Sequence, residues 1–255
     1  MGSVFGMNLF FSVGRVTASE LTDPGHDTMV KQATARVAII IDDIGTSTGY
    51  MDEILRIQEP LTWAILPLTP KCLIYAAEGQ RRGLDILLHQ PLEPLQPQGA
   101  PDPGLIYRFF TDEQIIQQLE INLGSVPGLK GINNHMGSAG TADRRLMNVI
   151  MGELKKRNLF FIDSYTISNS VADQCARDYQ VPFGRRTIFI DERSDFQSKI
   201  KALEFLLKYA LEHGSAIGIG HARRGTGEAI AAMLPKFKEA NVEIVPVSAL
   251  TKCLR

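Results

Sequence analysis

Short apolar runs alternate with longer amphipathic stretches along this chain from residue 36 onward. Eight runs rich in β-branched and aromatic residues are expected to form strands, at 37–41, 62–66, 85–88, 131–133, 159–162, 187–190, 216–219 and 243–247. Four stretches carry apolar residues at positions i, i+3 and i+4 and are expected to be helices, at 111–123, 142–156, 196–213 and 225–240. This alternation is typical of repeated β-α units, which build a parallel sheet.

Seven or eight such units within about 215 residues fit a closed or nearly closed barrel. The sequence therefore predicts the α/β class, as a (β/α) barrel of seven or eight mostly parallel strands, with an open doubly wound sheet as the alternative. No linker interrupts the pattern, so residues 36–255 are expected to form a single domain. The stretch 91–104 is too long for an ordinary connection, and we expect it to lie over the functional face.

The first 35 residues differ from the rest. Residues 4–13 are mostly apolar, and Val16, Thr17 and Ala18 resemble a signal-peptidase site, although no Lys or Arg precedes them in the first 13 residues. Residues 1–35 are therefore expected to be either a leader that exports the protein, for example to the periplasm, or a poorly ordered segment of a cytoplasmic protein. No apolar run approaches the roughly 20 residues of a membrane span.

The charge is nearly balanced, with 27 basic and 28 acidic residues and a net charge of -1. No field of one sign is expected that would attract nucleic acid or an anionic membrane. A neutral or small substrate fits this composition better. The composition indicates no oligomeric state.

Polar residues follow the apolar runs. The C-terminal ends of parallel strands meet on one face, where active sites of such folds lie. Each aspartate alone could cap a helix, and each histidine alone could be structural. However, three of the five histidines stand directly after an apolar run, which favours a shared site at the strand ends. The residues at this position are Asp42, Asp43, His89, His135, Asp163, Ser164, Asp191 and His221.

Two carboxylates and two histidines in one cavity form a ligand set suited to zinc or another divalent metal. Neighbouring side chains diverge at a strand end, so one of Asp42 and Asp43 could ligate the metal while the other accepts a proton or caps the next helix. Glu93 follows His89 by four residues. It could reach the same metal, orient a ligand, or be an ordinary loop carboxylate.

Five short motifs occur in one order along the chain: Ile41-Asp42-Asp43-Ile44-Gly45, Leu88-His89-Gln90-Pro91-Leu92-Glu93-Pro94, Asn133-Asn134-His135-Met136-Gly137-Ser138, Phe161-Ile162-Asp163-Ser164 and Ile219-Gly220-His221. Together they resemble the divergent polysaccharide deacetylase family over residues 36–250. The resemblance implies a deacetylase-type barrel, a divalent metal, most fittingly zinc, and removal of N- or O-acetyl groups from a polysaccharide or amino sugar. Better known deacetylases have a second histidine where Glu93 stands, so His135 is expected to supply that nitrogen.

The resulting hypothesis assigns a role to each residue. Asp43, His89 and His135 would hold the metal, and Asp42 would be the general base. His221 would protonate the leaving group, with its tautomer fixed by Asp163 or Asp191. Further candidates on the same face are Glu93, Asn134, Ser138 and Ser164.

Two other functions fit the same sequence. One is a non-catalytic envelope protein that uses the barrel groove to bind glycan or a protein partner. The other is a different metal-dependent amidohydrolase that acts on small amides or peptides.

Overall fold

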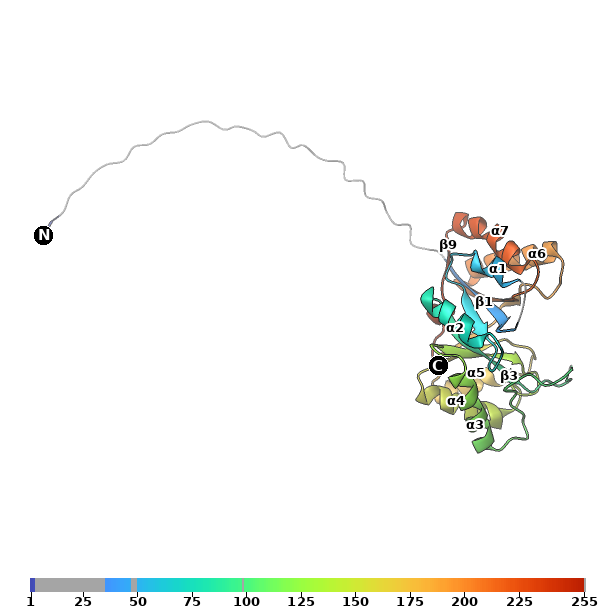
Figure 1. Ribbon diagram of the computed structural model, residues 1–255. Helices are drawn as coiled ribbons and strands as arrows, with labels where there is room; N and C mark the ends of the chain where they lie inside the picture. Colours follow the sequence, from blue (N-terminus) through green and yellow to red (C-terminus); the bar gives the residue numbers. More distant parts are fainter. Residues whose placement is uncertain (3–34, 47–49, 98, 255) are drawn as a thin grey trace. The chain divides into compact units, whose positions relative to one another are not determined.

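In the part of the chain that the structure describes, nine strands form one sheet in which every paired strand is parallel to its neighbour (Figure 1). Their order is β6-β5-β4-β3-β2-β1-β8-β7, and β9 pairs with the start of β1. The strands are β1 (Ala35–Ile44), β2 (Thr62–Ile65), β3 (Asp85–Leu92), β4 (Gly131–Met136), β5 (Phe160–Asp163), β6 (Phe183–Arg185), β7 (Ile188–Phe189), β8 (Ser215–His221) and β9 (Val242–Ile244). The α/β class and the parallel sheet are thus confirmed.

The structure is a computed structural model that describes residues 1–2, 35–46, 50–97 and 99–254. The expected leader, residues 1–35, falls almost entirely outside the described residues, so the leader and export remain predictions. The strands and helices from Ala35 onward belong to one domain.

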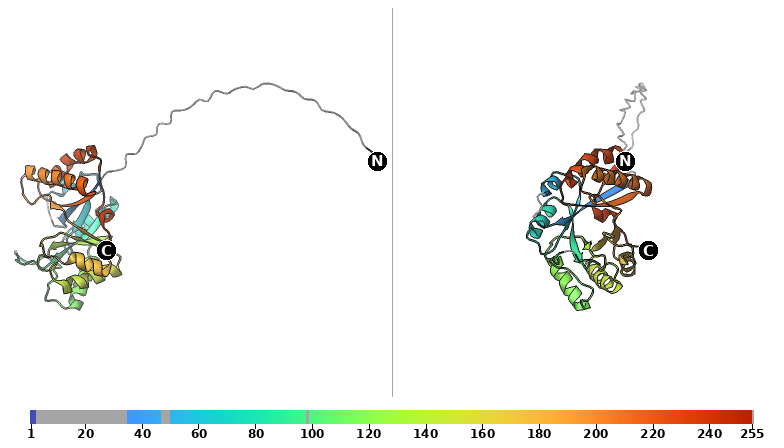
Figure 2. Two further views of the ribbon diagram at one scale, coloured as in Figure 1. Left: turned by 180° about the vertical axis from the view of Figure 1, so that it is seen from behind. Right: turned by 90° about the vertical axis from the view of Figure 1, so that its right-hand side faces the viewer.

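The sheet curves into a half-barrel, which confirms the expected barrel (Figure 2). Its two edge strands, β6 and β7, are separated by only Arg186 and Thr187. The N–H of Arg186 donates to the carbonyl of Asp163 on β5 at 3.0 Å, and the N–H of Thr187 donates to the carbonyl of Ile217 on β8 at 2.7 Å. One extended run therefore crosses from one edge of the sheet to the other.

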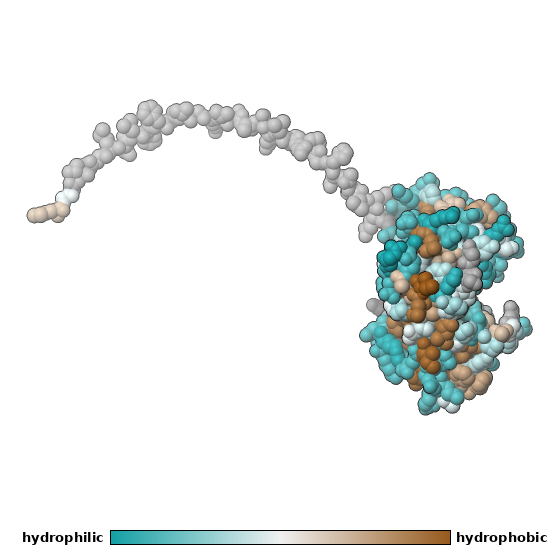
Figure 3. All heavy atoms as spheres, viewed as in Figure 1, coloured by the Kyte–Doolittle hydropathy of each residue, from teal (hydrophilic) through white to brown (hydrophobic). Residues whose placement is uncertain are grey.

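Helices surround the strands, as the right-hand view of Figure 2 shows. In the described chain they are α1 (Met51–Leu55), α2 (Cys72–Arg81), α3 (Asp112–Gly124), α4 (Arg144–Lys156), α5 (Ala172–Tyr179), α6 (Phe196–His213), α7 (Thr226–Glu239) and the 3-10 helix η1 (Val247–Leu250). Among the described residues, no helix is long and apolar enough to cross a membrane. Figure 3 shows a mostly polar face with apolar side chains over α2, where Leu73 and Ile74 are exposed.

The four expected helices correspond to α3, α4, α6 and α7. Helix α3 begins at a capping box, in which Thr111 Oγ1 accepts from the N–H of Gln114 and the side chain of Gln114 accepts from the N–H of Thr111. The sequence analysis missed α1, α2 and α5. Helices this short gain little from their own hydrogen bonds and depend on packing against the sheet, so their periodicity is a weak signal.

Alternate residues of each strand face two different cores. The outer core combines residues such as Ile39 and Ile41 of β1 with residues from the α-helices. The inner core contains Ala38 and Ile40 of β1 with their counterparts on other strands, and receives no buried residue from an α-helix among the described residues. The inner core therefore fills the barrel interior. Val247 of η1 joins it at the N-terminal ends of the strands.

Candidate functional site

The inward-facing apolar rows become polar at the C-terminal ends of the strands. Side chains two residues apart on a strand share a face, so the residues that continue each inner-core row point into the mouth of the barrel. Those on β1, β3 and β8 are Asp42, His89 and His221, two positions beyond Ile40, Leu87 and Ile219.

The side chain of Asp43 also points into the mouth of the barrel, but because of its backbone conformation and not because of strand alternation. It directly follows Asp42, so strand alternation alone would turn it toward the outer face. Its backbone φ is 60°, in the left-handed region that residues with a Cβ rarely adopt. This local turn brings the carboxylate of Asp43 back among the histidines, and Gly45 follows with a φ of 122°.

Three candidate ligand atoms from Asp43, His89 and His135 lie close together. Asp43 Oδ1 is 3.2 Å from His89 Nε2 and 3.1 Å from His135 Nδ1, and the two ring nitrogens are 3.1 Å apart. Ligands held about 2.0–2.1 Å from a tetrahedral zinc ion lie about 3.3–3.4 Å from one another. The nearly equilateral triangle therefore has the spacing of three metal ligands after a small expansion.

The surroundings of Asp43 also fit a cation. Its Oδ1 atom is buried and accepts no hydrogen bond from any residue that the structure describes, although two ring nitrogens lie beside it. Burial raises the pKa of Asp43, but His135 and His89 outweigh burial and hold that pKa far below its ordinary range. A buried, charged oxygen next to two imidazole nitrogens is a set of ligand atoms that suits zinc and similar divalent ions.

His89 is buried in the centre of the cluster. Its Nδ1 atom faces Asn133 Oδ1 at 2.9 Å, which leaves Nε2 directed toward Asp43. Burial disfavours the charged imidazolium, but the charges of Asp42 and Asp43 outweigh it and raise the pKa of His89 to about 9. The site therefore attracts positive charge.

Asp42 lies behind this triangle and is nearly inaccessible to solvent. Its Oδ1 atom accepts a hydrogen bond from Asn133 Nδ2 at 2.8 Å, and its Oδ2 atom lies 3.6 Å from His89 Nε2. Burial raises the pKa of Asp42, even though the charges of His89 and His221 oppose the rise. A carboxylate with a raised pKa is a better proton acceptor near neutral pH.

His221 is held from behind by Asp191. Its Nδ1 lies 2.8 Å from Asp191 Oδ1, and its backbone N–H donates to Asp191 Oδ2 at 2.8 Å. Burial lowers the pKa of His221, but the hydrogen bond to Asp191 and the nearby carboxylates outweigh burial and raise it. The other ring nitrogen, Nε2, lies 3.9 Å from Asp43 Oδ2 and so faces the cluster.

Of the two aspartates proposed to orient His221, the structure places Asp191 there and not Asp163. Asp163 accepts hydrogen bonds from the N–H of Tyr165 and from Ser170 Oγ, both at 2.8 Å. It directly follows the inward-facing Ile162, so strand alternation turns it toward the outer face.

Glu93 and Ser138 have partners elsewhere. The carboxylate of Glu93 accepts from the backbone N–H of Arg108 at 2.7 Å and from its guanidinium at 3.1 Å. Ser138 Oγ accepts from the N–H of Leu95 at 2.9 Å. The structure therefore brings neither side chain into the triangle, and both fasten the connection between β3 and α3.

Asn134 and Ser164 join β4 to the segment after β5. Asn134 Oδ1 accepts from the N–H of Ser164 at 2.9 Å, and Ser164 Oγ donates to the carbonyl of Asn134 at 2.8 Å. Asn133 Nδ2 donates to Ser164 Oγ at 3.4 Å, which links Ser164 to the cluster.

The sequence analysis missed three residues at the site. Asn133 bridges Asp42 and His89, and its inward position two residues before His135 was a usable signal. Asp102 Oδ2 lies 3.3 Å from His135 Nε2, and Arg223 Nη2 lies 3.5 Å from Asp43 Oδ2. Nothing in the sequence distinguishes Asp102 from other charged loop residues, whereas Arg223 stands in a basic pair, Arg223-Arg224, that could either meet an anionic substrate group or be solvated.

Comparisons with known proteins show the family of this chain. The family model of divergent polysaccharide deacetylases matches residues 39–251. An uncharacterized protein of Haemophilus influenzae is 34% identical over 218 residues, which cover 86% of this chain and 77% of the relative.

Solved structures give the same fold. An uncharacterized protein from Agrobacterium tumefaciens C58 has a TM-score of 0.82 at 25% identity, over 86% of this chain and 90% of that one. BA3943, a CE4 family pseudoenzyme from Bacillus anthracis, has a TM-score of 0.53 at 15% identity, over 85% of this chain and 65% of that one. The second likeness concerns the fold alone. Because the family model spans nearly the whole described domain, this chain belongs to the divergent polysaccharide deacetylase family.

Proposed function

We propose that this protein is a metal-dependent hydrolase that removes N- or O-acetyl groups from a polysaccharide or amino sugar. One observation carries the proposal: Asp43 Oδ1, which is buried, His89 Nε2 and His135 Nδ1 lie 3.1 to 3.2 Å from one another. Family membership supports the substrate class.

Asp43, His89 and His135 would hold the metal, most fittingly zinc, because zinc prefers nitrogen and carboxylate ligands. Three protein ligands would be the usual number for a catalytic zinc site. When bound, a divalent metal there supplies a Lewis acid that polarises an acyl carbonyl and makes water more acidic.

Asp42 would take the proton of the attacking water at its Oδ2 atom. The amide of Asn133 holds the other carboxylate oxygen at 2.8 Å, so the carboxylate keeps a fixed direction. Asn133 also receives the Nδ1 proton of His89, at 2.9 Å. One amide therefore orients both the base and a metal ligand, which is the kind of support that such sites require.

His221 would donate a proton from Nε2 to the departing amine or alcohol. Asp191 accepts the Nδ1 proton of His221 at 2.8 Å and stabilises the charged imidazolium. Thr226 Oγ1 donates to Asp191 at 3.0 Å and holds that carboxylate in place. Base and acid would thus come from β1 and β8, which are neighbours in the sheet.

A second candidate is a non-catalytic protein that binds glycan in the groove. Tyr107 and Phe109 stack with ring centroids 4.9 Å apart, and the side chain of Phe109 is 76% exposed. The exposed ring of Phe109, supported by the half-buried Tyr107, offers a flat apolar contact surface for a ligand. This candidate requires binding of acetylated glycan without acetate release.

Metal binding tests the first part of the proposal. Chelator-treated protein is titrated with Zn²⁺ by calorimetry and with Co²⁺ by visible spectroscopy, and one ion is expected to bind per chain. His135→Ala should abolish tight binding, whereas His213→Ala, which removes an exposed histidine from α6, should not. Equal binding by the two variants would contradict the ligand set.

Acetate release tests the second part. Zinc-loaded protein is incubated with N-acetylated and O-acetylated oligosaccharides and, separately, with small amides and peptides. Release from the sugars alone supports the deacetylase, and release from amides or peptides alone supports a different amidohydrolase. Zinc binding with glycan binding but no acetate release would contradict the enzyme and favour the non-catalytic candidate.

A further inference from the structure

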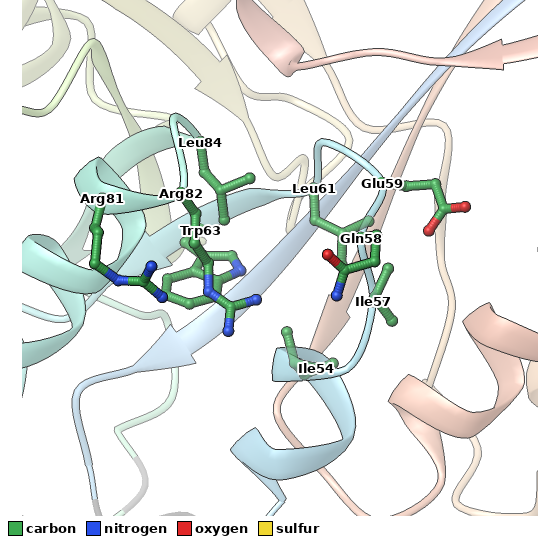
Figure 4. Close-up of a pocket in the computed structure, with 9 residues that line it drawn as sticks. All are labelled: Ile54, Ile57, Gln58, Glu59, Leu61, Trp63, Arg81, Arg82 and Leu84. Carbon is green, nitrogen blue, oxygen red and sulfur yellow. The ribbon is translucent and has the colours of Figure 1, made fainter.

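A pocket lies at the other end of the sheet from Asp43, His89 and His135. It has a volume of about 260 Å³ and is formed where the connection after α1 enters β2 and where α2 ends before β3 (Figure 4). The residues that line it include Ile57, Gln58, Glu59, Leu61, Trp63 and Arg82. These residues precede or begin β2 and β3, whereas His89 lies near the C-terminal end of β3.

Trp63 brings a buried hydrogen-bond donor to this pocket. Its side chain is almost fully buried, yet its Nε1 atom has no acceptor among the residues that the structure describes. Buried donors without a partner are rare because they forfeit their bonds to water. Figure 4 shows the indole nitrogen on the edge of the ring that faces Leu61 and Gln58, across the pocket.

The opposite edge of the indole is fixed by helix α2. A Cβ atom on Gly79 would lie 3.3 Å from Cε3 of Trp63, so the absent side chain lets the helix pack directly against that edge. The ring of Tyr75 meets the indole edge to face at 6.4 Å. The ring is therefore held with Nε1 turned toward the pocket rather than toward the helix.

Arg82 brings a second donor to the same place. Its guanidinium lies 5.9 Å from the centre of the Trp63 ring. Nε donates to Glu78 at 2.6 Å and Nη1 to the carbonyl of Leu55 at 2.9 Å, while Nη2 has no hydrogen bond within the described chain. Arg81 also donates to Glu78, so two guanidinium groups share one carboxylate and leave a net positive charge.

We propose that this pocket binds a small carboxylate with an apolar body. One carboxylate oxygen would accept from Arg82, the other would accept from Trp63 Nε1 after a small movement of the side chains that cover this buried atom, and the apolar body would lie against Leu61, Ile57 and their neighbours. Glu59 does not oppose this placement, since Figure 4 shows its carboxylate directed away from Trp63 and Arg82. The volume is below the about 300 Å³ at which pockets for drug-sized ligands begin, which limits the ligand to a small molecule.

Trp63 makes the test direct, because it is the single tryptophan of the chain. Full-length protein labelled with ¹⁵N is titrated with benzoate, and the single indole N–H resonance is followed together with tryptophan fluorescence. We expect a saturable downfield shift with a Kd of about 1 mM or tighter, and much weaker binding of benzamide, which has the same shape without the charge.

Two variants complete the test. Arg82→Gln and Gln58→Glu should each weaken benzoate binding by about tenfold, the first by removing a cation and the second by adding an anion to the rim. Arg144→Gln is the matched control, since it removes an arginine from α4, which contributes no residue to the pocket. No saturable shift, equal affinity for benzamide, or unchanged affinity in both variants would overturn the proposal. Because zinc and acetate release are not involved, the outcome is independent of the proposed function.

Discussion

Asp102 Oδ2 lies 3.3 Å from Nε2 of His135, on the side of the ring away from Asp43. A histidine that ligates a metal through Nδ1 carries its proton on Nε2, and a carboxylate there fixes this tautomer. The loop that carries Asp102 is fastened to the barrel, because the carbonyl of Gly104 accepts from Gln90 at 3.1 Å and from Asn122 at 2.7 Å. The long connection after β3 thus reaches the site, as its length led us to expect.

Replacing Asp102 should therefore weaken metal binding without removing a ligand. We expect Asp102→Asn to lower the affinity for Zn²⁺ by about 10- to 100-fold, which is the usual cost of losing such a partner. Calorimetric titration of chelator-treated protein measures the change. Asp178→Asn, which removes an exposed carboxylate that pairs with Arg144, is the control. Unchanged zinc affinity in Asp102→Asn would show that His135 is oriented without this carboxylate.

The two buried aspartates Asp42 and Asp163 should respond differently to the same substitution. Asp42→Asn keeps the shape of the site but removes the proposed base, so acetate release should fall by about 100- to 10,000-fold while zinc affinity is retained. Asp163→Asn should retain the rate, because Asp163 faces the outer side of the sheet and bonds to Ser170. Steady-state rates and zinc titrations of both variants measure the contrast, and equal loss of rate in both would contradict the assignment.

Strand alternation explains how much of the site could be predicted. Asp42, His89 and His221 each stand two positions beyond an inward apolar residue, so the apolar pattern that gives the fold also gives their direction. The same rule, applied strictly, excludes Asp163 from the interior. The sequence analysis considered every polar residue after a strand, whichever way its side chain points. It therefore treated Asp163 and Asp191 as equal candidates for orienting His221.

Other features depend on contacts that no local pattern encodes. Asp43 joins the cluster through a φ of 60°, and Asp102 through a loop fastened by residues of β3 and α3. Strand β6 was not among the expected strands. It forms one edge of the sheet with only three residues, Phe183-Gly184-Arg185, of which one side chain is strongly apolar. In each case distant parts of the chain supply the stabilisation, so the local sequence carries little of the signal.

Asp191 should act through His221. Asp191→Asn removes the carboxylate that accepts the Nδ1 proton and stabilises the imidazolium, so we expect kcat to fall by about 100-fold or more with little change in KM. ¹⁵N chemical shifts of the His221 ring should report the altered tautomer independently of turnover. Thr226→Val removes one hydrogen bond to Asp191 and should have a much smaller effect. A raised KM with unchanged kcat would instead assign Asp191 to substrate binding.

Glu153 on α4 should make stability depend on pH. Burial raises the pKa of Glu153, but hydrogen bonds from Lys156 and Arg157 outweigh burial and lower that pKa below its ordinary range. A carboxyl whose pKa is lower in the folded state stabilises the fold above its unfolded pKa, and this contribution is lost as the pH falls through the folded pKa. Glu153→Gln should therefore reduce the free energy of unfolding by about 1.5 to 3 kcal/mol near neutral pH, and by progressively less in acid.

Urea unfolding at a series of pH values measures this difference. Glu120→Gln is the matched control, because Glu120 lies at the surface and also binds Arg157, at 2.9 Å. An exposed pair of this kind contributes about 0 to 1 kcal/mol, so its loss should change stability little at any pH. If Glu153→Gln reduced stability equally in acid and at neutral pH, the loss would come from packing of the side chain and not from its charge. The pH series thus separates these two contributions at a single buried position.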